Sequence, residues 1–188
     1  MPDQKSVVAD DVVDLLLIQH AQVEEQFLLV IGSTGETRRQ AFDDLVRLLA
    51  VHETAEEELI HPLSRTLRND AVVDDRLAEE RQAKETLTAL IDAGVDAEGF
   101  DTGLLLLRTA VLEHARHEER YEFPHLRARV PAERLQRLAT AFAAAEKVAP
   151  TRPHPGAESV KANIAGGPVL AIVDRVRDAV RRAADGKN

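Results

Sequence analysis

Cysteine is absent from this chain of 188 residues, which also lacks tryptophan and has a single tyrosine. Without cysteine there can be no disulfide, no thiol catalysis and no thiolate metal site, and a reducing compartment is the natural expectation. Aromatic residues make up only 3% of the chain, so surfaces that stack nucleic-acid bases are not expected. Any chemistry must therefore come from histidine, hydroxyl and charged side chains.

Long apolar runs and a positive net charge are also lacking. The segment 1–20 is acidic and Asp14 interrupts its apolar run, unlike a signal peptide, and no run reaches the roughly 20 apolar residues of a membrane span. The formal net charge of −9 disfavours nucleic acid and anionic membranes as partners. We expect a cytoplasmic protein, monomeric or homodimeric, with no nucleic-acid or membrane partner.

Apolar residues recur at helical spacing through most of the chain. Hydrophobic residues make up 44% of it, and a period of three to four residues predicts amphipathic helices. Pro62 and Pro124 fall near the ends of two of these helices, where proline removes a backbone donor and favours a bend. Four long helices are predicted at about 7–31, 37–67, 72–93 and 101–129.

This pattern predicts an all-α fold in which residues 1–130 form an up-down-up-down four-helix bundle. Residues 131–188 are expected to add a helix at about 132–147, a Pro-rich linker, and a short amphipathic helix at about 169–184. That last helix combines a valine stripe with several arginines, so we expect it to pack on the bundle or on a partner.

One segment of the chain is repeated. The stretch HETAEEELIHP, residues 52–62, aligns with HARHEERYEFP, residues 114–124, at an offset of 62. The alignment superposes His52 on His114, Glu56 on Glu118 and Pro62 on Pro124. The first two predicted helices are therefore expected to be a copy of the next two, packed about a pseudo-two-fold axis.

Polar residues occupy the apolar faces of these helices. Each copy carries His-x-x-x-Glu, whose side chains lie on one side of a helix and can direct two donor atoms at one point. A buried carboxylate without a partner costs several kcal/mol or takes up a proton. Two metal ions bridged by the two glutamates would satisfy the whole set, which we predict to be His20, His52, Glu56, Glu80, His114 and Glu118. Buried salt bridges without metal are the alternative, although Lys84 is the only Lys or Arg on the same stripes.

The order His, then His-x-x-x-Glu, then an inward residue, then His-x-x-x-Glu resembles the hemerythrin-like, HHE cation-binding family over about residues 7–129. The resemblance implies a four-helix bundle with a non-haem di-iron centre, oxo- or hydroxo-bridged. Glu56 and Glu118 would bridge the two iron ions, and His20, His52 and His114 would be terminal ligands. The implied function is reaction with dioxygen, peroxide or nitric oxide, as a sensor, a scavenger or a weak catalase.

Position 80 departs from the family, which commonly has a histidine there. With Glu80 the set has three anionic ligands, which favour the ferric state and harder cations. That suits redox or peroxide chemistry better than reversible oxygen carriage. In the alternative arrangement Glu80 stays outside the set and water fills its position.

Other polar residues receive weaker assignments. Tyr121 is expected on the core face, as a packing residue or as a proton donor to bound oxygen or peroxide. His117, one turn from His114, is a candidate to support the ligands. A solvated acidic face, with hydrogen bonds to the histidines as the alternative, is predicted for Glu53, Glu57, Glu58 and Glu119. Surface positions are predicted for His61, His125 and His154, and the Glu-x-x-His pairs that begin at Glu58 and Glu122 are not expected to form the main site.

A second function class stays open on the sequence. In it the bundle is a non-redox module, with zinc or no metal in the site, and the C-terminal helix recruits a partner.

Overall fold

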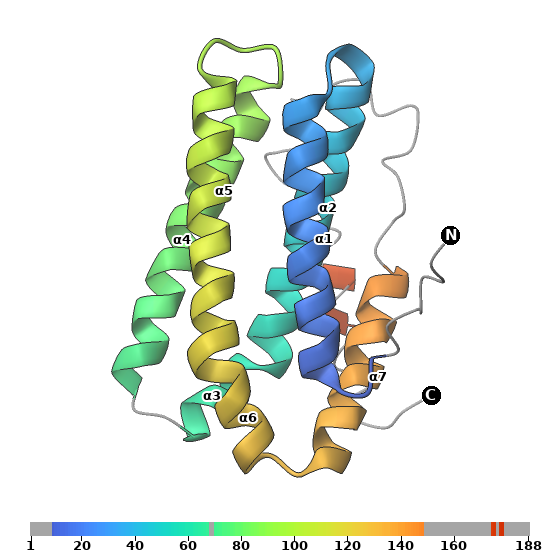
Figure 1. Ribbon diagram of the computed structural model, residues 1–188, viewed down its shortest axis with the longest axis vertical. Coiled ribbons are helices and arrows are strands. Elements are labelled where there is room, and N and C mark those ends of the chain that lie inside the picture. The colour runs from blue at the N-terminus through green and yellow to red at the C-terminus, as the bar shows by residue number, and fades with distance from the viewer. Residues whose placement is uncertain (1–8, 68–69, 149–173, 176, 179–188) are drawn as a thin grey trace, which may run out of the picture.

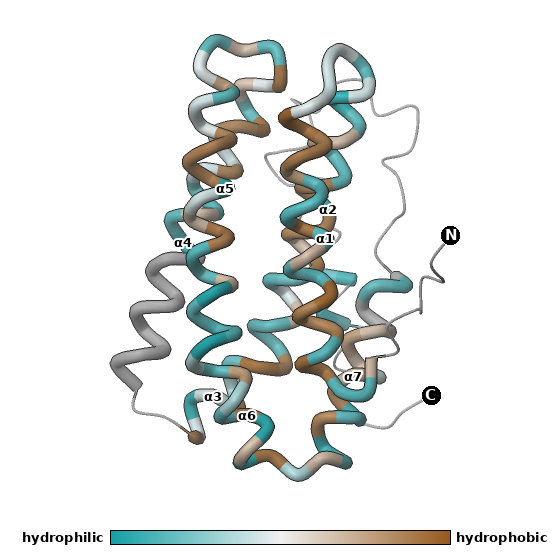
Figure 2. The backbone as a smooth tube through the Cα atoms, in the orientation of Figure 1, coloured by the Kyte–Doolittle hydropathy of each residue, from teal (hydrophilic) through white to brown (hydrophobic). Residues whose placement is uncertain are grey.

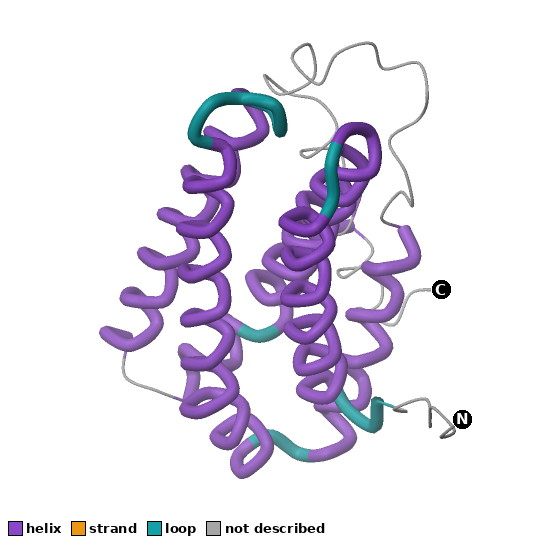
Figure 3. Tube along the Cα trace, turned by 45° about the horizontal axis from the view of Figure 1, so that its top comes forward, coloured by secondary structure: helices purple, strands orange, loops and turns teal. Residues whose placement is uncertain are grey.

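The computed structural model describes residues 9–67, 70–148, 174–175 and 177–178, and for residues 70–80, 144–145 and 148 it describes the backbone alone. Within these ranges the chain is helical and has no strand (Figure 3). The helices are α1 (Val12–Gly32), α2 (Gly35–Leu59), α3 (His61–Leu67), α4 (Asp70–Ala93), α5 (Phe100–His117), the π-helix η1 (Glu118–Glu122), α6 (Phe123–Arg129) and α7 (Ala132–Val148).

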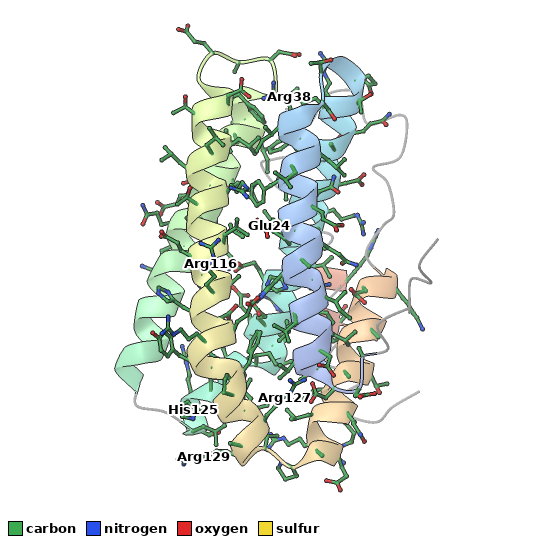
Figure 4. All side chains as sticks on the ribbon, viewed as in Figure 1. Glu24, Arg38, Arg116, His125, Arg127 and Arg129 are labelled. Atoms are coloured by element: carbon green, nitrogen blue, oxygen red, sulfur yellow. The ribbon has the colours of Figure 1, made fainter. Side chains whose placement is uncertain are left out.

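Four long helices lie side by side (Figure 1). Helix α1 packs along α2, and α4 packs along α5, while α1 also contacts α5. Glu24 of α1 reaches towards α5 and pairs with Arg108 at 3.0 Å (Figure 4). The all-helical prediction is confirmed, and the arrangement is consistent with a four-helix bundle.

Local sequence explains where the helices begin and end. Asp11 caps α1, because its side chain accepts hydrogen bonds from the backbone N–H groups of Val13 and Asp14 at 2.8 and 3.0 Å. Gly94 and Gly99 take positive φ angles of 81° and 83° at either side of the loop between α4 and α5. The chain therefore breaks between α1 and α2 and between α4 and α5, as the predicted helix ranges require.

Both copies of the repeat change helical geometry just before their proline. In the first copy α2 ends at Leu59 and α3 begins at His61, immediately before Pro62. In the second copy the π-helix η1 intervenes before Pro124, which lies in the first turn of α6. Proline cannot donate to the helical ladder and its ring clashes with the carbonyl four residues earlier, so a regular α-helix cannot continue through either position.

The apolar core is divided into two clusters. One cluster lies between α1, α2, α4 and α5 and includes Phe27, Leu45 and Leu104. The other joins the first turns of α1 to the end of α2, α6 and α7, and includes Leu59 and Phe142. Helix α7 thus packs on α1 and α2 (Figure 1), where the sequence predicted a further helix.

In the described part of the chain, every helix is too short or too polar to span a membrane. The predicted helix at about 169–184 lies almost wholly outside the described residues. Of that segment, Arg177 is described, and its Nε donates a hydrogen bond to Oε1 of Glu58 at 2.7 Å.

Candidate metal centre

A layer of polar side chains separates the two apolar clusters. His20 of α1 follows Leu16 of one cluster and precedes Val23 of the other. Figure 2 shows that α5, which also contributes to this layer, is more hydrophobic towards its start and more hydrophilic towards its end. The polar residues of the layer are at most 7% exposed: His20, His52, Glu56, His114 and Glu118.

These five side chains converge from α1, α2, α5 and η1. One ligand atom from each of four of them, His20, His52, Glu56 and Glu118, lies within 4.8 Å of the others. Three contacts of the same length join an imidazole Nε2 to a carboxylate oxygen. These 3.4 Å contacts are His52 to Glu56, His114 to Glu118, and His20 to Glu118.

The outer nitrogens of two of these imidazoles are held by acceptors. His20 Nδ1 lies 2.8 Å from Oε1 of Glu119, and His52 Nδ1 lies 2.9 Å from Oε1 of Gln19. A carboxylate accepts hydrogen bonds but cannot donate them, so Glu119 requires the proton of His20 to be on Nδ1. In both rings the Nε2 atom then points its lone pair into the layer, as it does in metal-binding histidines.

This arrangement fits a cation. Nε2 of His20 and Oε2 of Glu118 are buried without a hydrogen-bond partner among the described residues, and they face one another at 3.4 Å. A nitrogen lone pair and a carboxylate oxygen repel unless a proton or a metal ion lies near both. Imidazole and carboxylate are the donors that iron and similar ions take in proteins.

Protonation at this site is shifted by burial and by the neighbouring groups. Burial, together with the smaller effect of the nearby His20 ring, lowers the pKa of His52 to about 3. Burial alone would raise the pKa of Glu118, but hydrogen bonds from His114 and His20, and the positive charge of those rings when they are protonated, outweigh burial and hold that pKa below the ordinary value. His52 is thus neutral and Glu118 ionised at neutral pH, the states in which each binds metal.

Acidification of the metal-free protein is expected to lower its free energy of unfolding. As pH falls from 6.5 towards about 3, the unfolded chain protonates His52 while the folded protein does not, so the unfolded state gains stability. Urea unfolding from about pH 8 to about pH 4 measures the slope, and His52→Leu is expected to flatten it. An equally steep slope in that variant would contradict the assignment.

A small cavity adjoins the layer. Its volume is about 20 Å³, and the residues that line it include His20, His52 and His114 together with the small residues Ala83 and Ala110. That volume holds about one water-sized molecule. A small molecule that occupies this cavity would therefore lie next to the histidines.

Glu80 lies in α4, but its side chain is outside the described part of the structure. The next residue on the same predicted stripe, Lys84, is 46% exposed and forms ion pairs with Glu57 at 2.5 Å and Glu53 at 3.4 Å. Both glutamates belong to α2, so this lysine ties α4 to α2.

The structure corrects the prediction for Tyr121. We expected its side chain on the core face, yet it is 50% exposed, while Glu122 is buried. The π-helix is the reason, because its wider turn adds a residue after Glu118 and rotates every following side chain. The hypothesis that Tyr121 is a proton donor assumed a position on the core face, and its side chain does not occupy that position.

A second buried polar contact lies next to the repeat's prolines. Glu122 accepts a hydrogen bond from the Ser64 hydroxyl, and His61 is also buried. The prediction that His61 lies on the surface is wrong, since the break between α2 and α3 turns it inward. His125 and His117 are exposed, and His154 lies outside the described residues.

Sequence reasoning missed Gln19 and Glu146. Gln19 is 2% exposed, and its Nε2 donates to Oε1 of Glu146 in α7 at 2.6 Å while its Oε1 faces His52. A signal for Gln19 was its position beside His20, at the edge of the apolar stripe of α1. Nothing in the spacing indicates Glu146, because the contact spans 127 residues.

Comparison with known proteins gives two matches. Residues 11–148 match the family model described as the hemerythrin HHE cation binding domain. The chain is also 25% identical, over 134 residues, to a DNA nickase from Nostoc sp. (strain PCC 7120 / SAG 25.82 / UTEX 2576). That alignment covers 71% of this chain and 38% of the relative, so the chain spans well under half of the relative's length. No solved structure matches.

Proposed function

The chain belongs to the hemerythrin HHE cation-binding family, and from this membership we propose that it is a non-haem di-iron protein. It reacts with dioxygen, peroxide or nitric oxide, as a sensor, a scavenger or a weak catalase. The four long helices form an up-down-up-down bundle around the metal centre. The observation that carries the proposal is the set of imidazole Nε2 atoms held 3.4 Å from two buried carboxylates.

Each ligand has a role in this proposal. His20, His52 and His114 would be terminal ligands, and Glu56 and Glu118 would be the bridging ligands, since each carboxylate offers two oxygens. Glu80 would complete the set from α4. Three carboxylates and three imidazoles supply six side chains, which suits two ions better than one.

When bound, a pair of iron ions supplies electrons to, or accepts them from, the small molecule. The chain's own residues hold the site in place. Glu119 fixes the His20 ring, Phe123 packs on that ring at a centroid distance of 5.7 Å, and the apolar clusters on either side exclude bulk water. The cavity beside Ala110 admits the guest.

Metal analysis and optical spectra of the full-length protein test the proposal. We expect about two iron ions per chain and a near-ultraviolet absorption that reductant bleaches and peroxide restores. A matched variant, Ala110→Leu, fills the cavity without replacing a ligand residue. It should therefore keep the iron and slow the reaction with peroxide. Fewer than about one metal ion per chain would sink the proposal. A zinc-loaded protein, or a bound metal that shows no redox response, would instead support the non-redox module.

Nicking of DNA, which the name of the Nostoc relative states for that protein, is not part of the proposal. Most of that relative lies outside the match, and this chain carries a formal net charge of −9, which opposes contact with phosphate backbones.

A further inference from the structure

We infer that Gln19 and Glu146 act as one hydrogen-bonded relay that positions His52 and makes α7 part of the metal centre. The relay runs from Oε1 of Glu146 to Nε2 of Gln19 at 2.6 Å, and from Oε1 of Gln19 to Nδ1 of His52 at 2.9 Å. This inference rests on the proposed function, because it assigns a purpose to His52 as a ligand.

The direction of each hydrogen bond follows from chemistry. An amide side chain offers a donor group and an acceptor oxygen, and either end could face His52. The carboxylate of Glu146 can only accept, so it takes the amide N–H of Gln19 and leaves the amide oxygen for His52. That oxygen can only accept, so His52 carries its proton on Nδ1 and presents the Nε2 lone pair to the site.

Glu146 thus sets the tautomer of a residue that it does not touch. If Glu146 lacked its carboxylate, the amide of Gln19 could rotate by half a turn and donate to Nδ1 of His52. The proton of His52 would then lie on Nε2 and block metal binding there. A negative charge at the far end also polarises the two hydrogen bonds and makes Nε2 a better donor to a metal ion.

The two histidines of the first repeat half are held differently. Glu119, which is 39% exposed, accepts directly from His20, whereas a neutral amide at 2% exposure accepts from His52. The carboxylate that backs the amide comes from α7, which is outside the four long helices. The His52 side of the centre therefore depends on the docking of α7, and the His20 side does not.

Gln19 and Glu146 are positioning residues, and exchanging them tests the relay. Glu146→Gln should let a His52 population with the proton on Nε2 appear. Gln19→Glu alone should weaken metal binding about 10- to 100-fold, because two carboxylates would then face each other. The exchange Gln19→Glu with Glu146→Gln restores one amide and one carboxylate, and it should restore both the single tautomer and most of the affinity.

The first readout is the imidazole nitrogen NMR spectrum of the metal-free full-length protein, with His52 assigned by its loss in His52→Gln. The second is metal affinity by competition with a chelator. Lys147→Gln, at the exposed neighbour on α7, is the control for a change of charge and should alter neither readout. The relay is overturned if wild-type His52 carries its proton on Nε2, or if the exchange recovers nothing. A protein with the expected tautomers that binds no metal would overturn the proposed function and leave the relay standing.

Discussion

Replacing Glu118 by glutamine should weaken metal binding by more than about 100-fold, more than is usual for residues that only support ligands. The same change should leave the metal-free protein at least as stable as wild type at about pH 8, where an ordinary imidazole is neutral. The two effects have one cause. The buried carboxylate binds the metal ion, but when no metal is bound its charge destabilises the folded state.

The geometry explains the gain in the metal-free protein. Glu118 places its two oxygens 3.4 Å from Nε2 of His20 and of His114, and it is 1% exposed. A neutral amide of the same shape removes the buried charge, and its N–H group can donate to an imidazole lone pair. Binding sites commonly trade stability for function in this way.

A salt-bridge network without metal gives the opposite result. If protonated histidines neutralised Glu118, removing the charge would leave cations buried, and the free energy of unfolding would fall by about 3–5 kcal/mol. Chemical denaturation of metal-free Glu118→Gln, beside the exposed control Glu113→Gln on the preceding helix α5, separates the two cases. A large loss of stability in Glu118→Gln alone would contradict the metal assignment.

Replacing Phe142 by alanine is expected to lower the free energy of unfolding by about 3–5 kcal/mol, the usual cost of deleting a buried aromatic side chain. Phe142 is fully buried in the cluster that joins α7 to α1, α2 and α6. The change leaves a cavity because the other residues of this cluster come from several helices and cannot all close around it.

The same variant should also weaken metal binding, since α7 carries Glu146. Thr140→Ala, at an exposed position on α7, is the control and should change stability by less than about 0.5 kcal/mol. Urea unfolding of both variants measures the difference. A loss below about 1 kcal/mol in Phe142→Ala would mean that α7 is not part of the cooperative core.

Much of the fold could be predicted because its signals are local. Helical periodicity, the glycine turns and the two prolines gave the helices to within a few residues, and α7 begins at Ala132 as expected. The predicted start of the first helix, at about residue 7, is several residues too early. The apolar residues before Asp11 favoured a longer helix, whereas the side chain of Asp11 caps a helix that begins at Val12.

Side-chain direction after the repeat could not be predicted from a 3.6-residue period. The π-helix after Glu118 and the break after Leu59 change the phase of the helix, so Tyr121 lies outward while Glu122 and His61 lie inward. Proline signals that the helix must change, but several local solutions satisfy it. Packing against α3 and the polar contact with Ser64 select among them.

The sequence by itself determined the helical fold and five buried residues of the candidate centre. The repeated His-x-x-x-Glu motif lies in phase with an apolar stripe, so it indicates both that the segment is helical and which face of the helix is buried. Only the tertiary structure decided how those residues are held. The contacts of His20 with Glu119, of His52 with Gln19, and of Gln19 with Glu146 join residues 33 to 127 positions apart. Such contacts leave no periodic trace, because they depend on which helices pack together and on the rotation of each helix about its axis.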